Sequence, residues 1–244
     1  MIKTVMAPVV ALTAALLTAS LAACGGDTAE QGADSTAAKA GPAVTIASIA
    51  PATYNGTLPC ADCSGLITTL SVWPDSVYRL RETYDGKNKT PNVRMGRWQF
   101  DGKTLTLQGD TGVVGRWAFV HGDTLRMLDQ AGQPIASELP MHLLRTDAMD
   151  PVSESAVYVG SFVYWADAPT LRECASGKTI PVLMKGDYKV LEKAYTAAKL
   201  PVGSGQQVEV QARLVPRPAD MEGTEPFVFE ISKYIGPSIN GNCR

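Results

Sequence analysis

The stretch that most constrains the fold is a series of short runs, between residues 50 and 147, in which apolar and polar side chains alternate. Tyr78 and Leu80, for example, alternate with arginines, and turn sequences such as Asp101-Gly102 separate the runs. A period of two indicates strands with one buried face. Many such strands joined by tight turns predict an antiparallel β-barrel. Aromatic side chains on the apolar faces favour a filled core, with a small ligand-binding calyx as the alternative.

Residues 158–244 predict a different order of elements, namely three strands, one helix and two strands. Asp187 is expected to cap the helix, whose predicted apolar stripe consists of Tyr188, Leu191, Tyr195 and Ala198. This order of elements is that of an OB-fold. The polar segment 148–157, which contains Pro151, is expected to link the two domains. The sequence therefore predicts a mostly β protein with two domains and one helix.

The N-terminal residues predict export. Residues 1–23 combine a positive charge with a long run of small and apolar side chains, as a signal peptide does. An uncleaved membrane helix is the alternative, disfavoured because no polar stop-transfer flank follows. The run ends in Leu21-Ala22-Ala23-Cys24, which resembles the bacterial lipobox, so Cys24 is expected to be acylated and to anchor the chain in a membrane.

Residues 24–49 have hardly any large apolar side chain, and we expect them to form a lipidated, flexible tether. The residue after the predicted lipidation site is Gly25 rather than an aspartate. By the sorting rule of enteric bacteria, this favours the periplasmic face of the outer membrane.

Without Cys24, four cysteines remain in a chain expected to reach an oxidising compartment, where disulfides form. Of the three pairings, we expect Cys60–Cys63 and Cys174–Cys243, because each pair then stays inside one proposed domain. The second pair closes a loop of 243 − 174 = 69 residue steps, which chain-entropy arithmetic makes worth about 4 kcal/mol. The four-residue loop of the first pair constrains the unfolded chain far less, so that disulfide is expected to be more easily reduced.

Cys60 and Cys63 stand in a bend that leads into a strand, between Pro59 and Gly65. Thioredoxin-type motifs depend on a helix N-terminus that lowers the thiol pKa, and no helix is expected here. We therefore interpret the pair as a structural or labile disulfide, or as a soft-metal site for Cu(I) or zinc. A closed zinc site would need four ligands. Asp62 is expected to be a turn residue that bonds its own backbone, with a proton acceptor as the alternative.

Several classes of function are disfavoured. A formal charge of −2 and a pI near 5.7, with no long basic run, give nucleic-acid binding no electrostatic support. His121 and His142 lie among strand-like residues, where catalytic or ligating roles are uncommon. The sequence contains no recognisable nucleophile motif, metalloprotease motif or phosphate-binding loop, so we do not expect an enzyme.

The segment from Tyr54 to Leu66, followed by Leu70, Tyr78 and Leu80, resembles the N-terminal signature of the NlpE lipoproteins. Further matches are Gly96-Arg97-Trp98, Leu105-Thr106-Leu107 and Leu128-Asp129 before Gly132. The resemblance covers nearly all of the chain after Cys24 and is strongest around the two thiols. It implies a lipocalin-like barrel followed by an OB-fold domain with its own disulfide, which Cys174 and Cys243 match.

The same resemblance implies a role in copper homeostasis and in envelope-stress signalling through the Cpx sensor kinase. We therefore expect a non-enzymatic sensor or binding lipoprotein. Cys60 and Cys63 would respond to copper or to redox state, and Cys174–Cys243 would report on disulfide formation by holding the second domain folded. The alternative is a lipocalin-like carrier that binds a small ligand in the periplasm.

Overall fold

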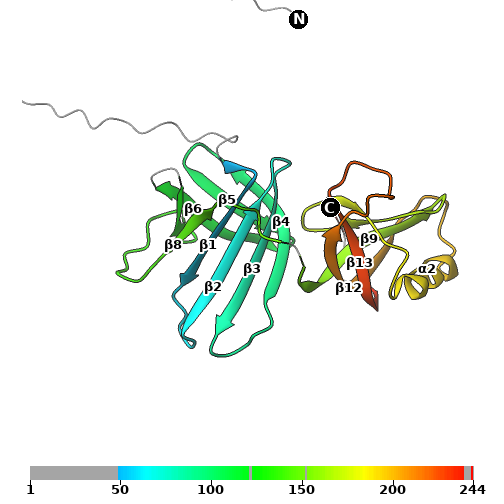
Figure 1. Cartoon of the computed structure of the whole chain (residues 1–244), viewed down its shortest axis with the longest axis horizontal. Helices are drawn as coiled ribbons and strands as arrows, with labels where there is room; N and C mark the ends of the chain where they lie inside the picture. Colours follow the sequence, from blue (N-terminus) through cyan, green and yellow to red (C-terminus); the bar gives the residue numbers. More distant parts are fainter. Residues whose placement is uncertain (1–48, 121–122, 152, 239–242, 244) are drawn as a thin grey trace, which may run out of the picture. The chain divides into compact units, whose positions relative to one another are not determined.

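The computed structural model describes residues 49–120, 123–151, 153–238 and 243, and its elements are labelled as in Figure 1. The predicted signal peptide, Cys24, nearly all of the tether and His121 lie outside the described residues. Ile49, at the end of the predicted tether, is fully buried in the core of the first domain. None of the helices in the described part has the length and hydropathy that are needed to cross a bilayer.

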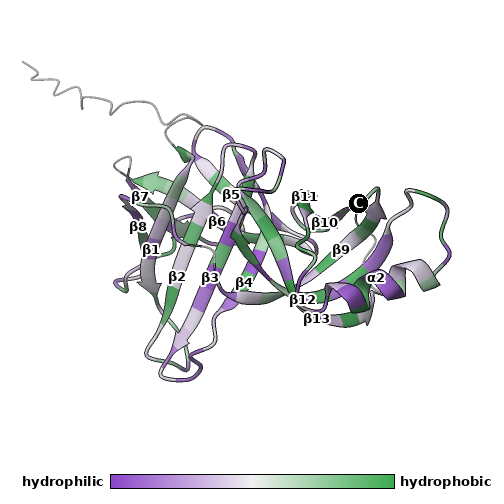
Figure 2. Ribbon diagram, turned by 45° about the vertical axis from the view of Figure 1, so that its right-hand side comes forward, coloured by the Kyte–Doolittle hydropathy of each residue, from purple (hydrophilic) through white to green (hydrophobic). Residues whose placement is uncertain are grey.

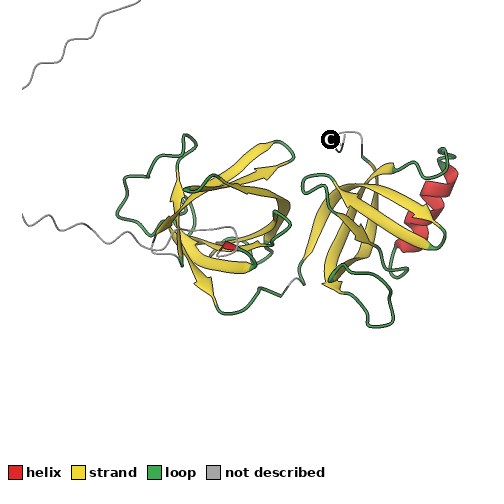
Figure 3. Ribbon diagram, turned by 90° about the horizontal axis from the view of Figure 1, so that it is seen from above, coloured by secondary structure: helices red, strands yellow, loops and turns green. Residues whose placement is uncertain are grey.

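Eight antiparallel strands form a closed barrel in which each strand pairs with the next (Figures 1 and 3). The strands are β1 (Ala52–Leu58), β2 (Gly65–Val72), β3 (Val77–Asp85), β4 (Asn92–Phe100), β5 (Thr104–Gly109), β6 (Gly112–Val120), β7 (Thr124–Leu128) and β8 (His142–Thr146). This confirms the predicted antiparallel barrel. Strand β8 closes the ring and is held by three residue pairs to β1 and three to β7, whereas β1 and β2 share seven pairs.

The barrel core follows the alternation seen in the sequence, because successive side chains of a strand point to opposite faces. Tyr54, Leu70, Tyr78 and Leu105 are completely buried, and Figure 2 shows apolar and polar residues alternating along these strands. Several polar positions depart from the pattern, and Arg79 is the largest of these buried side chains. Arg79 lies on the outer face of β3, yet only 1% of its side chain is exposed.

The segment after β8 covers Arg79. The guanidinium of Arg79 donates to Asp150 Oδ2 at 2.9 Å and pairs with Glu154. The neighbouring Arg81 binds the same two carboxylates, at 2.7 Å and 3.4 Å. The backbone N–H of Asp150 also donates to Thr53 Oγ1 at 2.9 Å. Asp150 and Glu154 of the expected linker are therefore fixed to the outside of the barrel, and we call this set of contacts the linker clamp.

The second domain contains five strands and a helix: β9 (Ser155–Trp165), β10 (Ala168–Glu173), β11 (Thr179–Pro181), α2 (Tyr188–Ala197), β12 (Gln206–Pro216) and β13 (Phe227–Pro237). The strand order is β11-β10-β9-β12-β13, and a parallel bridge between Val182 and Phe229 joins the two ends of the sheet. This arrangement, with the helix between the third and fourth strands, confirms the predicted OB-fold. Strand β9 begins at Ser155, inside the segment expected to be linker.

Helix α2 buries Tyr188 and Leu191, while Ala198 follows the helix and is exposed, so the predicted stripe is one residue too long. The predicted role of Asp187 is wrong in its detail. Asp187 precedes the helix as expected, but its carboxylate makes no capping bond to it. Instead, Oδ2 accepts the backbone N–H of Tyr234 at 3.0 Å, which fastens the start of the helix to β13.

Candidate functional site

The candidate site is the loop that joins β1 to β2 and contains both cysteines of the CxxC motif. The loop lies at one end of the barrel and contains bends but no helix. Glycine is favoured at position 65, where the loop enters β2, because a Cβ atom there would lie 2.4 Å from the methyl group of Thr57 and would force it to move. The backbone N–H of Ser64 donates to the carbonyl of Asp85 at 3.2 Å. The end of the loop is therefore fixed to two neighbouring strands.

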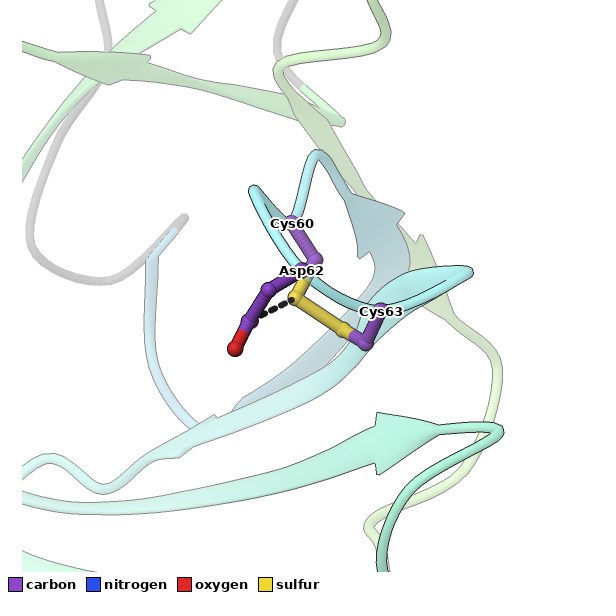
Figure 4. A group of neighbouring side chains, drawn as sticks. All are labelled: Cys60, Asp62 and Cys63. Atoms are coloured by element: carbon purple, nitrogen blue, oxygen red, sulfur yellow. Dashed lines mark hydrogen bonds between the residues drawn. A yellow bond between two sulfur atoms is a disulfide. The ribbon is translucent and has the colours of Figure 1, made fainter.

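Cys60 and Cys63 are joined by a disulfide with a Cα–Cα distance of 5.3 Å (Figure 4). Both residues are half-buried. Because the sulfurs are bonded to each other, this oxidised form offers no thiolate as a nucleophile or as a metal ligand. The thiol chemistry of the loop consequently requires reduction first.

Asp62 lies beside this disulfide, with its Oδ1 atom 3.6 Å from Cys60 Sγ (Figure 4). Its carboxylate forms an ion pair with Lys87 of the β3–β4 loop, rather than the expected bond to its own backbone. The two side chains are 71% and 46% exposed, and exposed pairs of this kind contribute about 0–1 kcal/mol. No local pattern marks Lys87 as a partner, because it lies 25 residues away from Asp62 in the chain.

Cys60, Asp62 and Cys63 form a group whose potential ligand atoms all lie within 4.8 Å of one another, and no second group of this kind occurs in the described part of the chain. The oxidised loop does not fit a metal ion. After reduction, the loop would present two thiolates and one carboxylate. Thiolates suit Cu(I), whereas a closed zinc site needs a fourth ligand.

The second disulfide joins Cys174, just after β10, to Cys243, with a Cα–Cα distance of 4.5 Å. Directly after β13, the backbone N–H of Ser238 donates to the carbonyl of Gln207, at the start of β12, at 3.0 Å. The side-chain oxygen of Gln207 lies 3.3 Å from Cys243 Sγ. The disulfide thus ties the C-terminal segment back to a strand in the first half of the OB-fold.

The histidines were not expected to be site residues. His142 is exposed at the start of β8. Sequence reasoning also missed Arg79, which it assigned to solvent as the polar partner in an alternating strand. No local pattern marks the carboxylates that cover it, because they lie 71 and 75 residues further along the chain.

Two family models match the chain, one for each domain. The model described as the NlpE N-terminal domain matches residues 54–138, and the model described as the NlpE C-terminal OB domain matches residues 152–244. Lipoprotein NlpE of Escherichia coli (strain K12) is 32% identical over 151 residues, which are 61% of this chain and 62% of the relative. The match thus spans less than two thirds of that relative's length.

Two solved structures are also similar. The crystal structure of the Cpx pathway activator NlpE from Escherichia coli is 26% identical, with a TM-score of 0.33, over 79% of this chain and 98% of that chain. A putative lipoprotein from Shewanella oneidensis is 28% identical, with a TM-score of 0.36, over 43% of this chain and 96% of that chain. The fold assignment rests on the strand topology and on the two family models.

Proposed function

Because this chain belongs to the NlpE family in both of its domains, we propose that it is a non-enzymatic lipoprotein of the cell envelope that responds to envelope stress. The relative in Escherichia coli is named a lipoprotein, and the solved NlpE of that organism is called a Cpx pathway activator. The observation that carries the proposal is the oxidised CxxC loop at the end of the barrel, with a carboxylate beside it. We propose that Cys24 is acylated and holds the chain at the periplasmic face of the outer membrane.

The proposed sensor is the Cys60–Cys63 pair. Reduction by an external dithiol would transfer two electrons and two protons to the disulfide and leave two thiols. Both thiols lose their protons when they bind a soft metal ion, and two thiolates suit Cu(I). Copper homeostasis would then be linked to redox state, because only the reduced loop offers metal ligands.

The proposed role of the Cys174–Cys243 disulfide is to hold the OB-fold domain together. It closes 69 residue steps, and constraining a loop of that length stabilises a domain by about 4 kcal/mol. A failure of disulfide formation in the envelope would weaken this domain selectively. We propose that the weakened state favours contact with an envelope-stress sensor kinase.

A Cu(I) competition titration tests the metal part of this proposal. We expect the reduced protein to take up one Cu(I) ion and the oxidised protein to take up none. The variant Cys60→Ser/Cys63→Ser should lose binding, whereas the matched control Cys174→Ser/Cys243→Ser should keep it. Equal Cu(I) affinity of the wild type and the Cys60→Ser/Cys63→Ser variant would refute copper binding by this loop.

A stress-reporter assay in cells tests the signalling part. We expect Cys174→Ser to raise the reporter signal at normal expression, and Cys24→Ser to remove the protein from the membrane fraction. A Cys174→Ser variant that melts and signals like the wild type would refute the proposed role of the second disulfide.

A further inference from the structure

The barrel contains a cavity of about 280 Å³ at the end where the CxxC loop lies. Its floor is formed by Leu80, Leu107 and Trp117, which project inward from β3, β5 and β6. Its rim includes Pro59, directly before Cys60, and Ile135 of the β7–β8 loop. Almost the whole lining is apolar. The volume is near the lower end of small-molecule sites, which begin at about 300 Å³.

At the opposite end, apolar and aromatic side chains pack inside the barrel. Ile49 and Tyr54 are completely buried there, and the ring of Phe119 packs edge-on against Tyr54 and Phe100, with centroid distances of 6.2 Å and 5.6 Å. The apolar cavity therefore lies at the end with the CxxC loop, whereas the pocket at the opposite end has a mostly polar lining that includes Thr53, Asp123 and Asp147.

Gly115 explains why this end is hollow. It pairs with Leu107 across β5 and β6, at an inward-facing position that has no side chain. The register shifts directly beside this pair, so Val114 is an extra residue on β6. Bulges of this kind turn side chains away from their regular direction and often lie beside functional sites.

Trp117 supplies an unsatisfied hydrogen-bond donor beside the hollow. Its side chain is 3% exposed, and its indole N–H has no acceptor among the described residues. A Cβ atom on Gly115 would lie 3.3 Å from that nitrogen, so the missing side chain leaves space next to it. By contrast, the indole N–H of Trp98 donates to the carbonyl of Trp73 at 2.9 Å. An unpaired buried donor is costly, and an incoming acceptor would relieve that cost.

We propose that this end of the barrel binds a small, neutral, apolar molecule with one hydrogen-bond-accepting oxygen, which pairs with the Trp117 N–H. The apolar lining excludes polar ligands. Glu82 is the charged residue of the lining, and its carboxylate, which pairs with Arg94, disfavours an anionic ligand. This proposed site supports the alternative function, that of a small-ligand carrier. It goes beyond redox or copper sensing, because ligand binding here needs neither thiol.

The test uses the oxidised full chain with Cys24→Ser, which removes the predicted acylation residue and leaves the described residues unchanged. The probe is Prodan, a neutral naphthyl ketone dye whose emission shifts when it leaves water. We expect saturable binding by one dye molecule. Ile135→Trp should fill the rim and weaken binding about tenfold or more, because an overfilled apolar site rejects its ligand. The matched control is Leu139→Trp in the same loop, whose side chain is 58% exposed and outside the lining, and it should bind within about twofold of wild type.

Two further variants keep the test decisive if Ile135→Trp fails to fold. Trp117→Phe keeps an aromatic ring but removes the N–H, and it should weaken Prodan binding by about two- to twelvefold, the value of one net hydrogen bond. It should leave the binding of a naphthalene dye without the ketone unchanged. Gly115→Ala places a methyl group beside the indole nitrogen and should also weaken Prodan binding. Absence of saturable binding, or equal affinities of wild type, Trp117→Phe and Gly115→Ala, would overturn the proposal.

Discussion

Arg79 offers the sharpest test of how the linker clamp stabilises the barrel. We consider Arg79→Met, which keeps much of the apolar stem but removes the guanidinium. The wild-type side chain is 1% exposed, and its two partners, Asp150 and Glu154, are 11% and 23% exposed. Removing one partner of a buried ion pair costs about 3–5 kcal/mol, because the charges that remain lose their compensation.

Two features reduce the expected cost in this protein. Both carboxylates are partly open to water, and both keep Arg81 as a partner at 2.7 Å and 3.4 Å. We therefore expect Arg79→Met to lower the free energy of unfolding by about 2–3 kcal/mol, below the usual loss for a buried pair. Urea unfolding followed by tryptophan fluorescence measures this loss.

The matched control is Arg94→Met. Arg94 also pairs with a glutamate on the barrel, but it is 42% exposed, so its loss should cost about 0–1 kcal/mol. Limited proteolysis adds a readout specific to the clamp, because only Arg79→Met should speed cleavage between residues 147 and 154. Equal losses of stability in the two variants, or unchanged cleavage in Arg79→Met, would refute the clamp.

Four further predictions follow from individual contacts. Burial alone would raise the pKa of Glu154, but a backbone hydrogen bond and the guanidiniums of Arg79 and Arg81 together hold it below the ordinary value of 4.5. The folded chain thus binds a proton at Glu154 less readily than the unfolded chain does. The stability that ionised Glu154 contributes is complete above the ordinary value of 4.5 and is lost as pH falls through the lower folded pKa. The urea midpoint should therefore fall on acidification, and it should fall less in Glu154→Gln. Burial raises the pKa of Tyr78 from 10.0 to about 12. The stability that the protonated hydroxyl contributes is therefore complete below pH 10 and is lost as pH rises towards the folded pKa. Tyr78→Phe should unfold at a higher alkaline midpoint than wild type, as measured by circular dichroism. Cys174→Ser/Cys243→Ser should cost about 4 kcal/mol in calorimetry and Cys60→Ser/Cys63→Ser about 2 kcal/mol, because the Cys60–Cys63 disulfide closes a loop of only four residues. Equal losses would contradict the chain-entropy account. Gly65→Ala should cost about 1–3 kcal/mol because of the clash with Thr57 Cγ2, and Thr57→Ser, which removes that methyl group, should restore most of the loss.

The sequence predicted those parts of the fold that depend on local periodicity. The alternation around Tyr78 and Leu80 indicated a strand with one buried face, and both side chains are buried. The order of elements in the second half was enough to predict the OB-fold, which its strand order confirms. A period-two pattern and an order of elements are both carried by neighbouring residues, so they are visible without a structure.

Features that depend on distant residues could not be predicted. The alternation assigned Arg79 to solvent, and only the folded chain brings Asp150 over it. Asp187 lies at the position of a helix cap, but its carboxylate accepts a hydrogen bond from a backbone N–H of β13 instead. The hollow beside Gly115 was equally invisible, since it depends on which residue pairs with the glycine on the neighbouring strand. In each case the decisive partner lies on another element.

The barrel is held most weakly where the short strand β8 closes it. Three residue pairs on each side hold it, against seven between β1 and β2. Closure also joins residues 89 to 93 positions apart, and contacts of such high sequence separation slow folding. The linker clamp begins just beyond β8, so its contacts help to keep β8 in the barrel. If the clamp contacts break, β8 can separate from β1 and β7. The unpaired edges of β1 and β7 would then be templates for pairing with another chain.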